Sequence, residues 1–325
     1  MKKVEQFILL IISALALCTI LFGVMNYLNK NKMQTIEQFT QPGQKDTSKN
    51  NVKNIHTEEK VSPTISKNHN TLWGAYTADI NFTDFQKRVG VEANINAIFV
   101  GWNDPFPFYA TSLLGDKTLL IFWEQYSVTL DDIISGSSDK YIKQFANDAI
   151  SSKSNLILAP LHEMNGNDNP WSGMAKNNTP EKVVLTWKHI HDLFPISTDI
   201  KWGWAVNNDS NPNIQTNQIQ NYYPGDDYVD YVGVDGFNFG NPWETYSEVF
   251  SSALNKLRVY KKPIYIFSMA CSQGPKKAPW ITDALKRIQS DPDISAFVWF
   301  NENKEKNWLL WSDPDSLNAF QNGLK

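Results

Sequence analysis

The sequence predicts an α/β fold, a (β/α)₈ TIM barrel over residues 71–325 that follows an N-terminal membrane helix and a flexible linker. Eight short apolar runs, rich in β-branched and aromatic residues, alternate with amphipathic stretches over this region. Most runs are nearly continuous in apolar character, as expected for parallel strands covered by helices. Eight such units in one domain-sized stretch favour a closed barrel over an open doubly wound sheet. No Gly-x-Gly-x-x-Gly motif follows the first run to support a dinucleotide-binding fold.

Residues 1–28 are predicted to form a signal anchor. Lys2 and Lys3 precede an uncharged, mostly apolar run over residues 7–25, which is long enough to cross a bilayer as a helix. No small-x-small cleavage site follows this run, so we favour an uncleaved anchor over a cleaved signal peptide. Lysines flank the run on both sides and barely set its orientation. The protein is therefore predicted to be a single-pass protein of the cell membrane, and the kind of domain places the barrel on the extracytoplasmic side.

Residues 29–70 are predicted to be a disordered linker. Asn, Lys, Gln, Thr and Ser dominate this segment, and large apolar residues are few. Such a segment cannot bury enough surface to offset the entropy lost on ordering.

The composition bounds the function. The net charge of -4 argues against a nucleic-acid surface, which needs a concentrated basic face. Aromatic residues make up 13% of the chain, with 12 Trp. Core packing explains most of them, and a sugar-binding cleft would explain the remaining aromatic residues, because pyranose rings stack on flat aromatic faces. The two cysteines, Cys18 and Cys271, provide no disulfide framework.

The barrel elements follow in chain order. The predicted strands are Leu72–Ala78, Asn96–Trp102, Thr118–Trp123, Asn155–Glu163, Ile200–Val206, Asp230–Gly236, Pro263–Met269 and Ser295–Phe300. The clearest helical stretches between them are Asp139–Ser152, Pro180–Phe194, Glu244–Tyr260 and Pro279–Ser290. Thr179 followed by Pro180 is typical of a capped helix start.

In such a barrel the chemistry lies where strands end and the following loops begin. The fourth predicted strand ends in His162-Glu163-Met164-Asn165-Gly166, and Pro170-Trp171 follows. This motif resembles the end of strand four in glycoside hydrolase family 26, the family of β-mannanases. The resemblance implies that Glu163 is the general acid/base that protonates the leaving glycosidic oxygen. A glutamate suits this role because burial raises the pKa of a carboxyl group. A zinc site would need a second histidine at His-Glu-x-x-His spacing, which is absent, and a salt-bridged structural Glu163 is the remaining alternative.

The resemblance covers nearly all of residues 72–325. The stretches that carry it, besides strand four, are Thr118–Tyr126, Lys201–Trp204, Tyr223–Gly236 and Val298–Glu305. It implies a polysaccharide substrate of mannan or β-glucan type, and no metal or organic cofactor. It also implies that His162, Asn165, Trp171, Trp204, Phe237, Trp299 and Trp123 contact the substrate.

Strand seven departs from the family pattern. The family carries a nucleophilic Glu after a Lys-Pro pair and a short apolar run, and here Ser268 occupies that position after Lys262-Pro263. No Asp or Glu lies between Glu248 and Asp283. A tyrosine that often contacts the nucleophile is replaced by Phe237, two residues after Asp235. The aromatic pair often found before Pro-Trp is also replaced, by Asp168-Asn169.

Three hypotheses stay open. In the first, Asp235 or Glu302 is a surrogate carboxylate that supports an inverting attack by water. This reaction needs about 6.5–9.5 Å between the surrogate carboxylate and Glu163. The alternative for Glu302 is a solvated loop carboxylate. In the second, the barrel binds polysaccharide without cleaving it, in an exopolysaccharide or cell-wall system. In the third, it is a docking module of a membrane assembly. Five tryptophans lie at or near predicted strand ends and are either cleft residues or core: Trp102, Trp123, Trp171, Trp204 and Trp299.

Overall fold

The computed structural model describes residues 71–78 and 81–325 of the chain. The predicted anchor over residues 1–28 and the predicted linker over residues 29–70 lie outside these residues. Within the described ranges, no helix is both long and apolar enough to cross a membrane.

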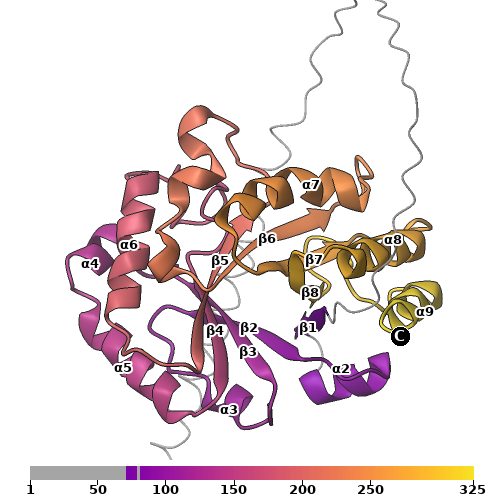
Figure 1. The fold of residues 1–325 in the computed structure, drawn as a ribbon, viewed down its shortest axis with the longest axis horizontal. Coiled ribbons are helices and arrows are strands. Elements are labelled where there is room, and N and C mark those ends of the chain that lie inside the picture. The colour runs from indigo at the N-terminus through magenta and orange to yellow at the C-terminus, as the bar shows by residue number, and fades with distance from the viewer. Residues whose placement is uncertain (1–70, 79–80) are drawn as a thin grey trace, which may run out of the picture. The chain divides into compact units, whose positions relative to one another are not determined.

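Eight parallel strands form a closed barrel in which each strand pairs with the next along the chain, and the eighth pairs with the first (Figure 1). The predicted (β/α)₈ fold is therefore confirmed. The strands are β1 (Leu72–Thr77), β2 (Ile95–Gly101), β3 (Thr118–Glu124), β4 (Asn155–Pro160), β5 (Ile200–Asn207), β6 (Tyr231–Asn238), β7 (Ile264–Cys271) and β8 (Ile294–Asn301).

Helices surround the barrel (Figure 1). They are α2 (Phe82–Val89), α3 (Phe108–Thr111), α4 (Leu130–Ile134), α5 (Asp139–Ser151), α6 (Pro180–Asp192), α7 (Tyr246–Leu257), α8 (Lys277–Ser290) and α9 (Pro314–Gly323). Short 3₁₀ helices lie at Gln215–Asn217, Ile219–Tyr222, Asp226–Tyr228 and Arg258–Tyr260. The predicted cap of α6 is present, since the Thr179 side chain accepts a hydrogen bond from the Lys182 backbone.

The barrel interior is filled by side chains, so it is a packed core and not a channel. Phe122 and Phe267 lie in this interior cluster together with the small side chains of Ala159 and Ala205. The ring of Phe267 requires a glycine beside it, because a Cβ on Gly233 would lie 2.4 Å from that ring and 2.1 Å from the carbonyl oxygen of Tyr265.

The second core layer lies between strands and helices and contains most of the tryptophans. Trp123 stacks on Phe145 of α5 with 4.2 Å between ring centroids. Trp299 contacts Phe320 of α9 edge to face at 5.5 Å. These indoles are buried on the outer side of the strands, where the helices cover them.

Three strand ends differ from the prediction in a way that shapes the site. β4 ends at Pro160, three residues earlier than predicted, because Leu161 and Glu163 both adopt left-handed backbone conformations with φ of 54°. β6 and β7 each extend two residues further than predicted, to Asn238 and Cys271. The chain after β4 therefore turns, whereas β6 and β7 continue as strands beyond their predicted ends.

Candidate active site

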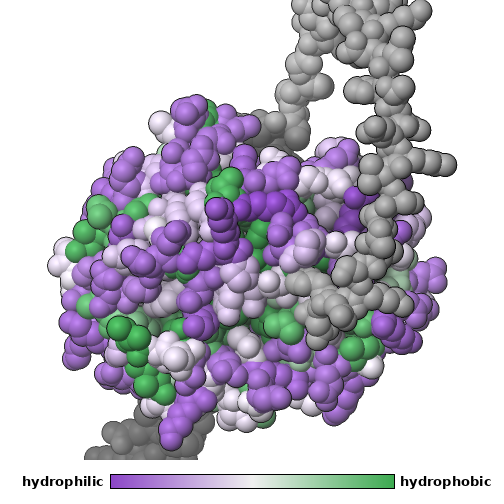
Figure 2. Space-filling view, viewed as in Figure 1, coloured by the Kyte–Doolittle hydropathy of each residue, from purple (hydrophilic) through white to green (hydrophobic). Residues whose placement is uncertain are grey.

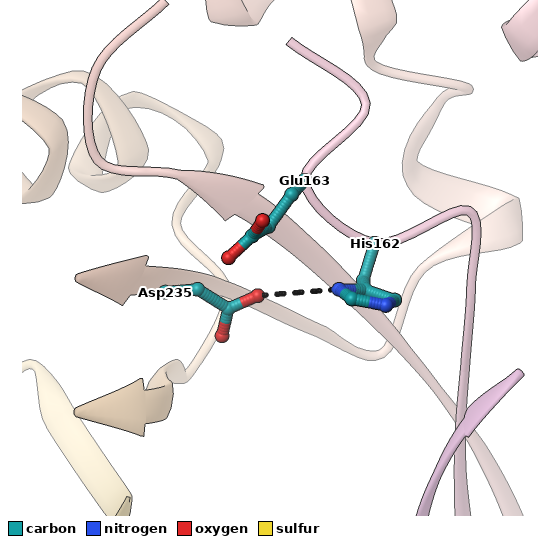
Figure 3. Close-up of side chains that lie close together, drawn as sticks. All are labelled: His162, Glu163 and Asp235. Atoms are coloured by element: carbon teal, nitrogen blue, oxygen red, sulfur yellow. Dashed lines mark ion pairs between the residues drawn. The ribbon is translucent and has the colours of Figure 1, made fainter. Parts of the chain in front are cut away.

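His162, Glu163 and Asp235 converge at the carboxyl-terminal end of the barrel (Figure 3). His162 and Glu163 lie in the turn directly after β4, and Asp235 lies on β6. One nitrogen or oxygen atom from each of the three side chains lies within 4.8 Å of those from the other two. The structure thus brings together the predicted general acid and one of the two predicted surrogate carboxylates.

The turn that carries Glu163 is held in a strained conformation. A non-glycine residue with a left-handed backbone costs on the order of 1–3 kcal/mol and persists only where its surroundings fix it. Here the Glu163 backbone donates a hydrogen bond of 2.9 Å to the carbonyl oxygen of Ala205 on β5. The Leu161 backbone donates to the Gln125 side chain at 3.1 Å, and the indole of Trp171 donates to the carbonyl oxygen of His162 at 2.7 Å. These contacts fix the direction of the Glu163 side chain.

Asn165 connects the same turn to β5 through hydrogen bonds. Its side chain accepts a hydrogen bond from the Asn207 backbone at 2.8 Å and donates one to the Asn207 carbonyl oxygen at 2.9 Å. Its own carbonyl oxygen accepts a hydrogen bond from the Asn217 side chain. Asn165 was predicted to contact substrate, and the structure shows it buried in a backbone-binding role.

His162 lies between two carboxylates. Its Nδ1 is 3.8 Å from Oδ2 of Asp235, and its Nε2 is 3.7 Å from Oε1 of Glu124 at the end of β3. Burial by itself would lower the pKa of His162, but Asp235, Glu124 and Glu163 outweigh it and raise the pKa to about 9. His162 is therefore a cation at neutral pH.

Glu163 has the pKa of a general acid. Burial, and after it the negative charge of Asp235, raises the pKa of Glu163 to about 7, although the His162 cation opposes this rise. Asp168 raises the same pKa further, and Lys304 lowers it. Near neutral pH the carboxyl group therefore exists in both its protonated and its ionised form, as proton transfer in either direction requires.

Asp235 is a buried carboxylate with an unusual environment. Its side chain is 1% exposed, and neither oxygen has a hydrogen-bond partner within the described part of the chain. It forms the ion pair with His162 that is drawn in Figure 3. Burial raises the pKa of Asp235, whereas His162 lowers it.

Ser268 lies beside Asp235. In the ladder between β6 and β7 the two residues are direct partners, next to a register irregularity between Val234 and Asp235. Ser268 is buried. Glu302, the other predicted surrogate, is half-buried directly after β8 and is outside the group formed by His162, Glu163 and Asp235.

The tryptophans predicted near the cleft divide into two groups. Trp102, Trp123, Trp204 and Trp299 are buried and packed in the core, where no ring face is open to a ligand. Trp171 is also buried, but it lies 5.5 Å from the His162 ring and supports that side chain. Phe237 is half-buried and contacts Phe300 of β8 and Trp308.

Two further groups at this site were not among the predicted site residues. Glu124 ends β3 and supplies the second carboxylate that faces His162. Tyr126 follows two residues later and contacts Trp171 edge to face at 4.9 Å. Both belong to the Trp-Glu-Gln-Tyr run at the end of the third strand, and their position at a strand end was the available signal.

Residues 118–306 match the model of the glycosyl hydrolase family 26. Endoglucanase H of Acetivibrio thermocellus is 33% identical over 267 residues, which are 77% of this chain and 29% of that protein. The chain thus spans less than a third of this relative. A family 26 β-mannanase structure from Bacteroides ovatus superposes with a TM-score of 0.61 at 16% identity, covering 78% of this chain and 88% of that one. The catalytic domain of an endo-β-1,4-mannanase from Bacillus sp. JAMB-750 also reaches 0.61, at 15% identity, over 78% and 85% of the two chains.

Proposed function

Because the chain belongs to glycosyl hydrolase family 26, we propose that its barrel cleaves a β-linked polysaccharide of mannan or β-glucan type, with Glu163 as the proton donor. One observation carries the proposal: a carboxyl group with a pKa of about 7 lies beside a second, buried carboxylate. Two carboxyl groups of different protonation are what glycoside hydrolysis needs.

The spacing of the two groups favours a retaining reaction. Retaining enzymes hold their carboxyl groups about 5–5.5 Å apart, whereas inverting enzymes need about 6.5–9.5 Å to admit a water molecule. Oxygens of Glu163 and Asp235 lie within 4.8 Å of each other. This separation is shorter than inverting enzymes use, so it supports a nucleophilic role for Asp235 over the inverting one expected from the sequence.

The proposed reaction has two steps. Asp235 attacks the anomeric carbon while Glu163 gives its proton to the leaving oxygen, so the glycosidic bond breaks and a glycosyl ester forms on Asp235. Glu163, now ionised, takes a proton from water as that water attacks the same carbon, and Asp235 leaves as a carboxylate. The His162 cation stabilises the ionised form of Asp235 before the first step and after the second. Ser268, the direct partner of Asp235, stands at the position the sequence assigns to the family's nucleophile.

A second candidate function is binding without cleavage. The burial of Asp235 favours it, because a sugar reaches this carboxylate only after neighbouring side chains move. Under this proposal the barrel holds a polysaccharide, and Ser268 marks a hydrolase site that lacks its nucleophile. In both cases we propose that residues 7–25 anchor the barrel to the outer face of the cell membrane, near an assembly that makes exopolysaccharide or cell wall.

The test uses the full-length chain with β-mannan, mixed-linkage β-glucan and carboxymethyl cellulose, and it measures the release of reducing ends. Glu163→Ala should lower the rate by about 10²–10⁴. Asp235→Asn should be at least as harmful, whereas Glu302→Gln should leave the rate within about twofold. If Glu302→Gln abolishes release and Asp235→Asn does not, the surrogate is Glu302. If the native chain releases nothing while Ser268→Glu does, the second candidate function stands.

A further inference from the structure

We infer that Tyr126 and Phe239 are sugar-binding platforms on opposite sides of the barrel mouth, and that they select a neutral polysaccharide; this inference rests on the proposed function. The described surface is mainly hydrophilic on the face drawn in Figure 2, with hydrophobic residues in small separate patches. A single exposed aromatic ring is ordinary on such a surface, so the position of the ring and the side chains that support it carry the inference. Tyr126 is 58% exposed and Phe239 is 47% exposed.

Both rings directly follow a barrel strand. Tyr126 lies two residues after β3, and Phe239 lies immediately after β6. In the closed barrel β4 and β5 stand between these strands, so the rings flank the turn that carries Glu163. The carboxyl-terminal ends of the strands form the face of a (β/α)₈ barrel on which substrates bind.

The Tyr126 ring packs against the buried indole of Trp171. Its edge-to-face contact with Trp171 is 4.9 Å between centroids, and Trp171 is itself fixed through its hydrogen bond to His162. Burial of its phenol group, and then the charges of Glu124 and Glu163, raises the pKa of Tyr126 to about 12. Trp171 also lies 5.5 Å from the His162 ring, which places the Tyr126 ring beside the candidate active site.

The Phe239 ring is supported in the same way. It contacts Trp308 edge to face at 5.2 Å and lies 6.2 Å from Phe237. In each case a buried indole packs against the ring, and the rest of the ring stays exposed in the described chain. A fixed ring binds a sugar at little entropic cost, because it has few conformations left to lose.

The charges around the mouth decide the class of glycan. Glu124 and Asp168 supply carboxylates there, and Glu163 adds part of a negative charge near neutral pH, against the cation of Lys304. The buried charges of Asp235 and His162 compensate each other. This balance repels a uronic-acid polymer. The platforms and the charge together indicate a neutral β-linked glycan.

The test measures the binding of the full-length chain to mixed-linkage β-glucan, β-mannan and the uronic-acid polymer alginate by affinity electrophoresis. Tyr126→Ala and Phe239→Ala should each weaken binding to the preferred neutral polymer about three- to tenfold, as expected for the loss of one ring contact. Tyr126→Phe keeps the ring and should bind within about twofold of the native chain. Alginate should not retard the native chain.

Two exposed rings serve as matched controls. Phe108 is 47% exposed and Tyr109 is 70% exposed, and both lie on α3, where Phe106 packs against Phe145 in the outer helix layer. Phe108→Ala and Tyr109→Ala should leave binding unchanged. If the native chain binds and Tyr126→Ala binds equally well, the platforms are refuted while the proposed function stands. Retardation by alginate alone overturns the neutral-glycan inference, and a native chain that binds none of the polymers overturns both proposals.

Discussion

Nδ1 of His162 lies 3.8 Å from Oδ2 of Asp235, and the two side chains form a buried ion pair directly beside Glu163. The Asp235 charge raises the pKa of both neighbouring groups at this site. It makes His162 a stable cation, and it raises the pKa of Glu163. Glu163 therefore acquires the pKa of a general acid from its burial and from the charge of the side chain that we propose as its partner in catalysis.

Asp235→Asn should lower the pKa of Glu163 from about 7 toward its ordinary value of 4.5, because it removes a nearby negative charge. Asp168→Asn should lower it less, since Asp168 has the smaller effect on Glu163. Carbon NMR titration of the glutamate carboxyl groups measures both changes. An unchanged pKa in Asp235→Asn would mean that burial alone sets it.

Glu163→Gln should make the folded chain more stable at alkaline pH. Folding raises the pKa of Glu163 from 4.5 to about 7, so the stabilising contribution of its proton is fully present below about pH 4.5 and is lost as the pH rises through about 7. A glutamine stays neutral throughout. The free energy of unfolding of Glu163→Gln should exceed that of the native chain by about 2–3 kcal/mol near pH 8, on the order of the free energy that corresponds to the whole pKa shift of Glu163. The two proteins should be equally stable near pH 4.

Urea unfolding at both pH values measures this difference, and Glu181→Gln is the control. The pKa of Glu181 is lowered by a backbone hydrogen bond at the start of α6, so glutamine there gains no stability at alkaline pH. Equal gains in the two variants would refute the account of Glu163.

Asn165→Ala should destabilise the chain by about 2–3 kcal/mol, because it leaves buried polar backbone groups of Asn207 without partners. Asn167→Ala is the matched control two residues away, where the side chain is exposed and accepts only from Asn211. It should cost less than about 0.5 kcal/mol. Chemical unfolding compares the two, and a small loss in Asn165→Ala would show that other contacts hold the turn.

The fold could be predicted because eight apolar runs and their spacing leave few alternatives to a closed barrel. The end of β4 could not be placed, because left-handed conformations at Leu161 and Glu163 are rare for residues with side chains and carry no sequence signal. The tryptophans were ambiguous for a different reason. A strand end presents side chains both to the barrel mouth and to the helices, and composition does not tell which side an indole takes.

The sequence proposed residues for the site, and the structure adds their geometry. The motif at strand four identified Glu163, and strand ends that meet at one face brought Asp235 into consideration. The separation of the two carboxylates depends on the turn after β4 and on the irregular register between β6 and β7, so it could only come from the structure. On this separation we propose that Asp235 attacks the sugar and does not activate a water.

The most direct test of this account is the configuration of the first product. Proton NMR follows the reducing-end anomer that the full-length chain releases from mixed-linkage β-glucan or β-mannan during the first minutes. We predict the β anomer, because two displacements at the same carbon retain configuration. Release of the α anomer, or undiminished release by Asp235→Asn, would contradict the proposed pairing of Glu163 with Asp235.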